Sequence, residues 1–323
     1  MQNDNRMQTT PGKGLLPPVE ETQSPGNLDD HGIEAIGSSR IHRRSLVERI
    51  TFSLFRVAAA INGVALLTIV YFIVANGWEA IDWTFLSEPP RNSMTEGGIL
   101  PCIVGTLCLS LGAILVAFPI GVASAIYLNE YARPGKVLRL IRLGINNLAG
   151  VPSVVFGLFG LAFFVIYLKM GVSLLAGILT LGAMSLPVII GATEEALKAV
   201  PDTYREASLG LGATKLQTIF RVVLPSALPG ILTGGILGIS RAAGETAPIM
   251  FTAAVYYTRH LPSSLFDEIM ALPYHIYVLA TAGTEIQATR PLQYGTALVL
   301  IAMVLGINLI AIIYRSKLRK RPK

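Results

Sequence analysis

Long apolar stretches, separated by short polar segments, dominate the sequence. Each of six stretches is long enough to cross a bilayer, because a spanning helix needs about 20 apolar residues. The six predicted spans cover residues 52–75, 99–128, 145–168, 172–193, 226–250 and 292–314. The stretches are continuous rather than alternating in polarity, so they predict helices and not the strands of a membrane barrel. The predicted fold class is an all-α integral membrane protein with six transmembrane helices.

The composition agrees with a membrane protein and argues against a soluble enzyme. Of the 323 residues, 52% are hydrophobic and 14% are charged, whereas a soluble domain carries about 25% charged residues. Residues 1–40 differ from the rest, because they form a polar stretch rich in Pro, Gly, Asn and Asp. Such a segment buries too little apolar surface to fold by itself. We therefore expect a disordered tail over 1–40 and a membrane domain over 41–323.

Basic residues are concentrated in alternate segments between the predicted spans. The segments rich in Lys and Arg are 40–49, 133–142, 194–221 and 315–323, and the segments poor in them are 76–98, the short link at Lys169, and 259–290. Because basic loops stay on the cytoplasmic side of a membrane, this pattern predicts that both termini are cytoplasmic. The loop 194–224 is then cytoplasmic, and the loop 259–290 is periplasmic, where it forms either an interfacial helix or a gate.

The cytoplasmic loop 194–224 has the features of a docking element. Pro201 and Asp202 predict the start of a short helix, because proline is tolerated in the first turn and an acidic side chain favours the positive end of the helix dipole. Two glycines, Gly210 and Gly212, end this helix, and a second helical piece leads into the next span. The first helix carries one charged edge and one edge of small residues, which lets another protein approach closely.

The spacing of residues in this loop resembles the signature of the permease subunits of ABC importers. That signature reads Glu-Ala-Ala, three residues, Gly, nine residues, and Ile-x-Leu-Pro. This chain has Glu206-Ala207-Ser208, then Gly212, then Val222-Val223-Leu224-Pro225 at the same spacing. The two departures, Ser208 for Ala and Val222 for Ile, are conservative in size. The position between the fourth and fifth predicted spans also matches the family.

Three further stretches resemble the permeases of phosphate-specific (Pst) importers, and they resemble the PstA type more than the PstC type. These stretches are 146–160, 241–248 and 272–277. The resemblance covers about residues 50–315 and implies the Type I ABC importer permease fold, with a cytoplasmic coupling helix, in a bacterial inner membrane. It also implies three partners, which are a PstC-like permease, a PstB-like ATPase dimer and a PstS-like periplasmic phosphate-binding protein.

The ATPase activity is expected on a partner and not on this chain. The chain contains no G-x-x-x-x-G-K-[ST] loop, since Gly135-Lys136 is followed by Val137 and lacks the upstream glycine. The resemblance therefore implies a permease that is not an enzyme and holds no cofactor, with ATP and Mg bound by the partner ATPase. The residues that it implies for coupling to the ATPase are Asp202, Arg205, Glu206, Ala207, Ser208, Gly212, Leu224 and Pro225.

Two ionisable residues interrupt the fifth predicted span. Arg241 and Glu245 are four positions apart and so share one helix face, and an ionisable group at bilayer depth costs about 2.5–3.5 kcal/mol on insertion scales. A guanidinium fork matches two oxygens of an oxyanion, so both residues, with Thr246, are predicted to line a phosphate path. The alternative is a structural ion pair. Asn146 and Asn147 are weaker path candidates, because their amides could instead cap a helix.

Three other functions compete with phosphate import. The first is the same machine carrying another oxyanion, such as sulfate or molybdate, which Arg241 alone does not distinguish. The second is an ATP-independent transporter or channel, against which the docking loop argues. The third is a membrane enzyme, for which the sequence shows no pair of nucleophile and base and no cluster of metal ligands. We therefore expect no catalytic residue and no metal ligand on this chain.

Overall fold

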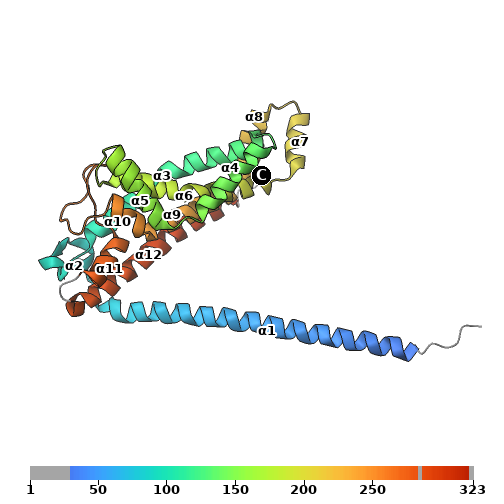
Figure 1. Cartoon of the computed structure of the whole chain (residues 1–323), viewed down its shortest axis with the longest axis horizontal. Helices are drawn as coiled ribbons and strands as arrows, with labels where there is room; N and C mark the ends of the chain where they lie inside the picture. Colours follow the sequence, from blue (N-terminus) through green and yellow to red (C-terminus); the bar gives the residue numbers. More distant parts are fainter. Residues whose placement is uncertain (1–29, 283–285, 320–323) are drawn as a thin grey trace, which may run out of the picture. The chain divides into compact units, whose positions relative to one another are not determined.

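The computed structural model of the chain describes residues 30–282 and 286–319, which fall into two units, residues 1–66 and 67–323. One long helix, α1 (Asp30–Gly77), makes up the described part of the first unit and extends into the second (Figure 1). The stretch Glu48–Ala80 has the length and hydropathy of a membrane span, and none of its most apolar window is buried. The predicted span 52–75 lies inside it.

The predicted tail 1–40 lies only partly within the described residues. Residues 1–29 are outside them, and residues 30–40 form the first turns of α1. The stretch contains Ile, Glu, Ala and Arg, which are compatible with a helix despite two glycines. Its helical structure therefore continues directly into the apolar span.

A small folded segment follows α1. It consists of η1 (Trp78–Ala80), α2 (Trp83–Ser87), η2 (Asn92–Met94) and an antiparallel pair of strands, β1 (Pro90–Arg91) and β2 (Glu96–Gly97). Asp82 caps α2 by accepting a hydrogen bond from the backbone N–H of Phe85 at 2.6 Å. Trp78 and Trp83 are strongly exposed, as expected for aromatic residues at a membrane interface.

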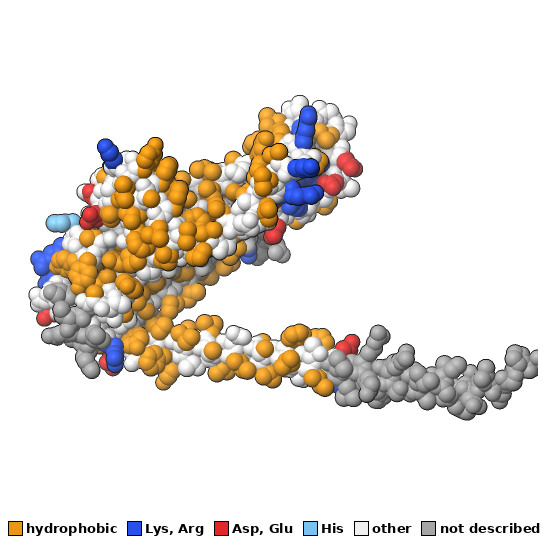
Figure 2. Space-filling model, in the orientation of Figure 1, with side chains coloured by type: hydrophobic (Ala, Val, Ile, Leu, Met, Phe, Trp, Pro, Cys, Tyr) orange, Lys and Arg blue, Asp and Glu red, His pale blue; other side chains and the backbone are white. Residues whose placement is uncertain are grey.

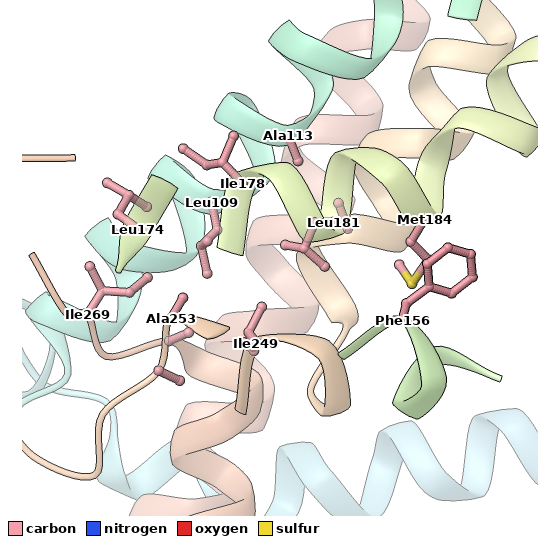
Figure 3. Close-up of a cluster of buried hydrophobic side chains, with 13 residues drawn as sticks. Leu109, Ala113, Phe156, Leu174, Ile178, Leu181, Met184, Ile249, Ala253 and Ile269 are labelled. Atoms are coloured by element: carbon pink, nitrogen blue, oxygen red, sulfur yellow. The ribbon is translucent and has the colours of Figure 1, made fainter. Parts of the chain in front are cut away.

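Three helices form the centre of the second unit. They are α3 (Leu100–Ile126), α6 (Leu174–Lys198) and α9 (Leu224–Gly244), and α3 packs against both of the others. Figure 3 shows part of the core between them, where Leu109 and Ala113 face Ile178 and Leu181. Gly238 of α9 lies close to neighbouring side chains, because an added Cβ would approach Ile114 to 3.1 Å. Small residues of this kind allow helices in a membrane to pack closely.

The third predicted span, 145–168, is not one straight helix. Residues up to Ala149 belong to α4 (Lys136–Ala149), and the rest form α5 (Ser153–Gly160) and the π-helical η4 (Leu161–Tyr167), with a bend of 101° between the two parts. The break falls at Gly150 and Pro152 because proline disfavours helical geometry in the residue before it. Among the described residues, five helices are long and apolar enough to span a membrane, or six if this bent pair is one span.

The fifth predicted span, 226–250, is also broken. Helix α9 ends at Gly244, Glu245 is extended (φ −78°, ψ 131°), and the short helix α10 (Ala247–Thr252) follows. Pro248 accounts for the break, because a proline ring in a continuous helix would collide with the carbonyl of residue 244. At its other end α9 continues without interruption from α8 (Lys215–Thr218) and the π-helical η5 (Ile219–Val223).

Of the remaining described segments, residues 253–282 pack on the side of the second unit opposite the loop 194–224, whereas the last helix runs back towards that loop (Figure 1). Residues 253–271 lie against α6, where the backbone N–H of Leu174 donates to the carbonyl of Asp267 at 2.9 Å. The helix α11 (Leu272–Thr281) follows, with Leu272, His275 and Leu279 buried, and α12 (Ile286–Arg319) contains the last predicted span, 292–314. The loop predicted as an interfacial helix or a gate is therefore only in part packed against the chain's own core, since residues 269–273 are buried and residues 263–266 are exposed.

Candidate coupling and translocation sites

The loop 194–224 folds into the two short helices that the sequence predicts. The first is α7 (Asp202–Gly210), with Pro201 at its N-cap. The chain then turns at Gly212, whose φ of +82° suits a residue without a side chain. Thr214 caps α8 with a capping box, since its hydroxyl accepts from the N–H of Gln217 at 3.3 Å while its own N–H donates to the Gln217 side chain at 2.9 Å.

One side of α7 faces outward and is not covered by the described chain. Asp202, Glu206 and Ala207, which the sequence predicts for coupling to an ATPase, all lie on this exposed side. Leu211, which follows the helix, is 91% exposed. Leu211 belongs to none of the motifs described above, and its only signal in the sequence is that it is an apolar residue next to the turn glycine. Figure 2 shows Lys and Arg side chains gathered at this end of the second unit, whereas hydrophobic side chains cover its middle.

Two of the predicted coupling residues face inward instead. The Ser208 hydroxyl is hydrogen-bonded to the hydroxyl of Thr218 at 2.9 Å, which joins α7 to α8. Arg205 donates to Oε1 of Glu130 at 2.9 Å, and its side chain is only 17% exposed. These two side chains hold α7 against the rest of the chain. The exposed surface of α7 is therefore formed by the other residues of this helix. Glu130 could not be predicted from the sequence, because it lies 75 positions away from its partner.

The last two predicted coupling residues belong to the start of α9. Leu224 packs against a buried cluster that includes Leu197 and Val223, so its role in the described chain is packing. Pro225 is exposed and directly follows the π-helical η5, and an irregular turn of this kind accommodates a proline, which has no N–H to donate. Neither side chain lies on α7 itself.

Arg241 and Glu245 lie at the end of α9 that is remote from the coupling loop. The Nε atom of Arg241 donates to Oε1 of Glu245 over 3.4 Å, with the two side chains 34% and 18% exposed. The ion pair forms although Glu245 lies just beyond the last residue of α9. A cation in the last turn of a helix is favoured by the helix dipole. Thr246 is partly buried in the break itself, and its carbonyl accepts from the N–H of Met250.

A polar contact that the sequence analysis missed adjoins this pair. Ser240, next to Arg241, donates a hydrogen bond to the side-chain oxygen of Asn308 on α12. Closer to the C-terminal end of α12, the Nη1 atom of Arg315 donates to the hydroxyl of Thr233 on α9 at 2.8 Å. Polar side chains between helices act as glue in a membrane. These two contacts hold α9 against the C-terminal half of α12.

Asn146 and Asn147 lie elsewhere, in the last turns of α4. The expectation that they cap the start of a span is wrong, because the N-cap residue of α5 is Pro152 and no side chain caps that helix. Asn147 is exposed, and its carbonyl accepts from the N–H of Gly150. Asn146 lines a cleft of about 220 Å³, and the other residues that line it are Arg142, Ile145, Ile190, Gly191, Glu194, Glu195 and Lys198.

Three of the four charged side chains that line this cleft are paired with one another. Glu194 receives hydrogen bonds from Nε of Arg142 at 3.3 Å and from Nζ of Lys198 at 3.4 Å. The predicted path residues therefore fall in two places, with Asn146 at this cleft and Arg241, Glu245 and Thr246 at the break after α9. The cleft is not lined by any of the last three.

Two titratable side chains outside the long helices are strongly affected by their surroundings. Burial lowers the pKa of His275 on α11 to about 4, so this imidazole is neutral near pH 7. Asp267 accepts hydrogen bonds at Oδ2 from the hydroxyl and N–H of Ser263 and from the N–H of Ser264, each at 2.8 Å. These bonds lower the pKa of Asp267, mainly through the Ser263 hydroxyl. They hold the turn at 263–267 in one conformation.

Comparison with known proteins identifies the class to which this fold belongs. Residues 117–323 match the family described as the binding-protein-dependent transport system inner membrane component. A chain of the MetNI methionine ABC transporter, solved in inward-facing conformations, has the same fold with a TM-score of 0.57 at 20% identity, over 68% of this chain and 95% of that one. A chain of a bacterial alginate ABC transporter reaches a TM-score of 0.53 at 15% identity, over 81% and 96%.

Several relatives have higher sequence identity to this chain than these two structures do. The phosphate transport system permease protein PstA of Mycobacterium leprae is 36% identical over 91% of this chain and 98% of its own. PstA 1 of Mycobacterium tuberculosis is 34% identical over 86% and 92%, and the probable ABC transporter permease protein YqgI of Bacillus subtilis is 31% identical over 83% and 95%. The chain belongs to the family of binding-protein-dependent transport system inner membrane components, and it is a multi-pass membrane permease.

Proposed function

We propose that the chain is the permease subunit of an ATP-driven importer of inorganic phosphate. The observation that carries this proposal is the similarity to PstA phosphate transport permeases at 31–36% identity over most of both chains. The stretches 146–160, 241–248 and 272–277, which resemble Pst permeases, support it independently of overall identity. The function of this chain is then to form the membrane path and not to hydrolyse ATP.

The chemistry of the break after α9 suits an oxyanion path. An unpaired guanidinium at this depth would bind phosphate strongly through a planar fork of N–H donors. Glu245 lies 3.4 Å from Arg241 and reduces the local positive charge. A transporter must release its substrate, so a weakened anion site is more useful than a strong one. In this proposal Arg241, Glu245 and Thr246 contact the passing phosphate, and Asn146 contacts it at the cleft on the other side.

The proposed partners follow from the same family. A PstC-like permease pairs with this chain to form the path, a PstB-like ATPase dimer binds ATP and Mg, and a PstS-like periplasmic protein delivers phosphate. The exposed side of α7, with Asp202, Glu206 and Ala207, is the surface proposed to enter a groove of the ATPase. The adjacent Leu211, which is 91% exposed, would be buried by such a partner. Both termini are then on the cytoplasmic side of the bacterial inner membrane.

The proposed mechanism is alternating access. ATP binding closes the ATPase pair, and α7 transmits this closure to the membrane helices as a rigid lever, which opens the path outward. Phosphate enters from the binding protein, and ATP hydrolysis returns the path to its inward-facing form. Substitutions at Glu206 or Gly212 that left both ATPase association and uptake intact would contradict the lever.

Uptake of labelled phosphate tests this function in cells that lack the chain. Reintroducing the chain is expected to restore uptake, and excess unlabelled phosphate is expected to compete while sulfate and molybdate are not. Competition by sulfate or molybdate would instead indicate another oxyanion. Uptake that persists in cells whose partner ATPase is inactivated would indicate an ATP-independent transporter.

A further inference from the structure

Basic side chains from several elements converge on the end of α3 that is nearest to the coupling loop. This end is the π-helical segment η3 (Tyr127–Tyr131). From α4, the Nη2 atom of Arg142 donates to the carbonyl of Leu128 at 3.1 Å. From α8, the Nζ atom of Lys215 lies 5.2 Å from the centroid of the Tyr131 ring, a cation–π contact. The third contact comes from α7 and is the most buried of the three.

This third contact is the ion pair between Arg205 and Glu130. The atoms Nη2 of Arg205 and Oε1 of Glu130 are 2.9 Å apart, and the two side chains are only 17% and 8% exposed. Glu130 lies at the C-terminal end of a helix, where the helix dipole disfavours a carboxylate. A nearby cation removes this penalty, and because the pair is shielded from water it resists screening by salt. Arg205 is therefore the cation that stabilises a carboxylate at this position, and the Asn129 amide donates to the same Oε1 atom at 2.9 Å.

Arg205 also binds the end of a second long helix. Its Nη1 atom donates to the carbonyl of Val200 at 2.8 Å, and its Nη2 atom donates to the carbonyl of Leu197 at 2.9 Å. The last carbonyls of a helix have no partner within it, and α6 ends at Lys198. One guanidinium thus satisfies acceptors at the ends of both α3 and α6 while its own backbone belongs to α7. The fixed fork of arginine makes this geometry possible, and a lysine offers no equivalent.

We propose that Arg205 is a positioning residue that, through Glu130 and the carbonyls of α6, makes α7 and the adjacent ends of α3 and α6 move as one body. Displacement of α7 by an ATPase is then passed to the two central helices of the permease. This inference rests on the proposed ATP-driven function for its effect on transport, but the rigid connection itself does not depend on the substrate. The π-helical η3 agrees with such a role, because π-helical turns are frequent at functional sites.

Coupling is tested by measuring transport and ATP hydrolysis on the same reconstituted complex of the permease pair and the ATPase. The variants Arg205→Gln and Glu130→Gln are expected to lower the phosphate moved per ATP hydrolysed about tenfold, with ATP hydrolysis retained. The double variant is expected to be no worse than either single one, because both remove the same connection. Arg205→Lys keeps the charge but not the fork, so its ratio is expected to lie between those of wild type and Arg205→Gln.

Arg139→Gln is the matched control, since Arg139 is an exposed arginine on α4. In this variant the phosphate moved per ATP hydrolysed is expected to stay at the wild-type value. An unchanged ratio in Arg205→Gln would overturn the inference. So would failure of Arg205→Gln, Glu130→Gln and Arg205→Lys alike to assemble, because Arg205 would then serve folding alone. Absence of phosphate transport by the wild-type complex would contradict the proposed function and not the rigid connection, which a second measurement addresses.

The second measurement is the distance between spin labels at Leu209 on α7 and Leu115 on α3, which are 48% and 77% exposed. The labels are attached to Leu209→Cys and Leu115→Cys in a chain with Cys102→Ala and Cys108→Ala. In the complex with the ATPase, this distance is expected to be the same with and without ATP when Arg205 is present. It is expected to change upon ATP binding in Arg205→Gln. A distance that changes in the chain with Arg205 would overturn the inference, whatever the substrate.

Discussion

Arg241 stands where α9 ends and the chain passes through an extended residue to α10. Its ion pair with Glu245 is partly exposed, at 34% and 18%, and exposed pairs contribute little to stability. The position of an arginine in a membrane helix is therefore better explained by a ligand than by stability alone. The same geometry also fits a purely structural ion pair. The two roles predict different phosphate uptake when both charged side chains are replaced.

Arg241→Ala is expected to lower phosphate uptake at least about tenfold in a complex that still assembles, since the guanidinium donors to phosphate are lost. The double variant with Glu245→Ala is expected to be equally inactive. Labelled-phosphate uptake, together with co-purification of the partner subunits, measures both. Recovery of uptake in the double variant would show that the pair is structural and that Arg241→Ala fails only because Glu245 is left unpaired.

His275 provides a prediction about pH. Its pKa is about 4 in the folded chain, below the value of about 6.5 expected in the unfolded chain. The unfolded chain thus binds the proton more readily, so stability is full above pH 6.5 and is lost as the pH falls from 6.5 towards 4. The loss from this residue is expected to reach up to about 3 kcal/mol.

Thermal unfolding in detergent between pH 4 and 7.5 measures this effect. The pH-dependent part of the unfolding temperature is expected to shrink in His275→Asn and to persist in His260→Asn, whose imidazole is exposed. An equal pH dependence in wild type and His275→Asn would show that another group causes the loss.

At the scale of elements, glycines determine how closely α5 approaches α10. A Cβ on Gly157 would lie 2.9 Å from the Cα of Pro248 and 3.0 Å from the carbonyl oxygen of Ala247. The first of these contacts is closer than van der Waals distance and involves backbone, which cannot move aside as a side chain can. Overpacking of this kind costs about 1–3 kcal/mol.

Gly157→Ala is therefore expected to lower the free energy of unfolding by about 1–3 kcal/mol, because α5 must move away from α10. Gly144→Ala is the matched control: Gly144 is within α4 and an added Cβ would meet no atom within 4 Å, so this change is expected to be neutral or slightly stabilising. Equal unfolding temperatures for the two variants in detergent would contradict the close approach of α5 and α10.

The elements also show what the sequence could predict. Hydropathy located the long helices well, because burial in a membrane requires continuous apolar stretches of a certain length. It missed the breaks at Pro152 and near Glu245, because the apolar composition continues through both and only local backbone effects of proline reveal them. The two short helices of the coupling loop were predictable from Pro201, Gly212 and local capping signals. The residues on α7 were predicted as one group, and the structure divides them into an exposed and an inward-facing set.

Contacts between distant segments were beyond the sequence analysis. Arg205 was predicted to couple to an ATPase, but its partner Glu130 lies 75 positions away and no periodic pattern links the two. Asn308, which binds Ser240, was missed for the same reason. Asn146 was predicted at the start of a span, because the apolar stretch gives no sign that α4 is a separate helix. These side chains acquire their roles only through the packing of whole helices.

At the scale of the whole molecule, the proposed orientation places α7 and α2 on opposite sides of the membrane. Leu211 after α7 and Trp83 on α2 are exposed, at 91% and 81%, so a cysteine at either position can react with a charged thiol reagent. In a chain with Cys102→Ala and Cys108→Ala, Trp83→Cys is expected to react from outside intact cells. In cells that lack the ATPase, Leu211→Cys is expected to react only after the membrane is opened. The reverse pattern would contradict cytoplasmic termini.

The central claim is that this chain forms part of a phosphate path driven by an external ATPase. Phosphate uptake into vesicles tests it most directly, with this chain, its partner permease, the ATPase and the binding protein purified and reconstituted together. The account predicts uptake of labelled phosphate that requires both ATP and the binding protein, that sulfate does not inhibit, and that Arg241→Ala abolishes. Phosphate uptake that continues without ATP, or ATP-driven uptake of sulfate in place of phosphate, would contradict it.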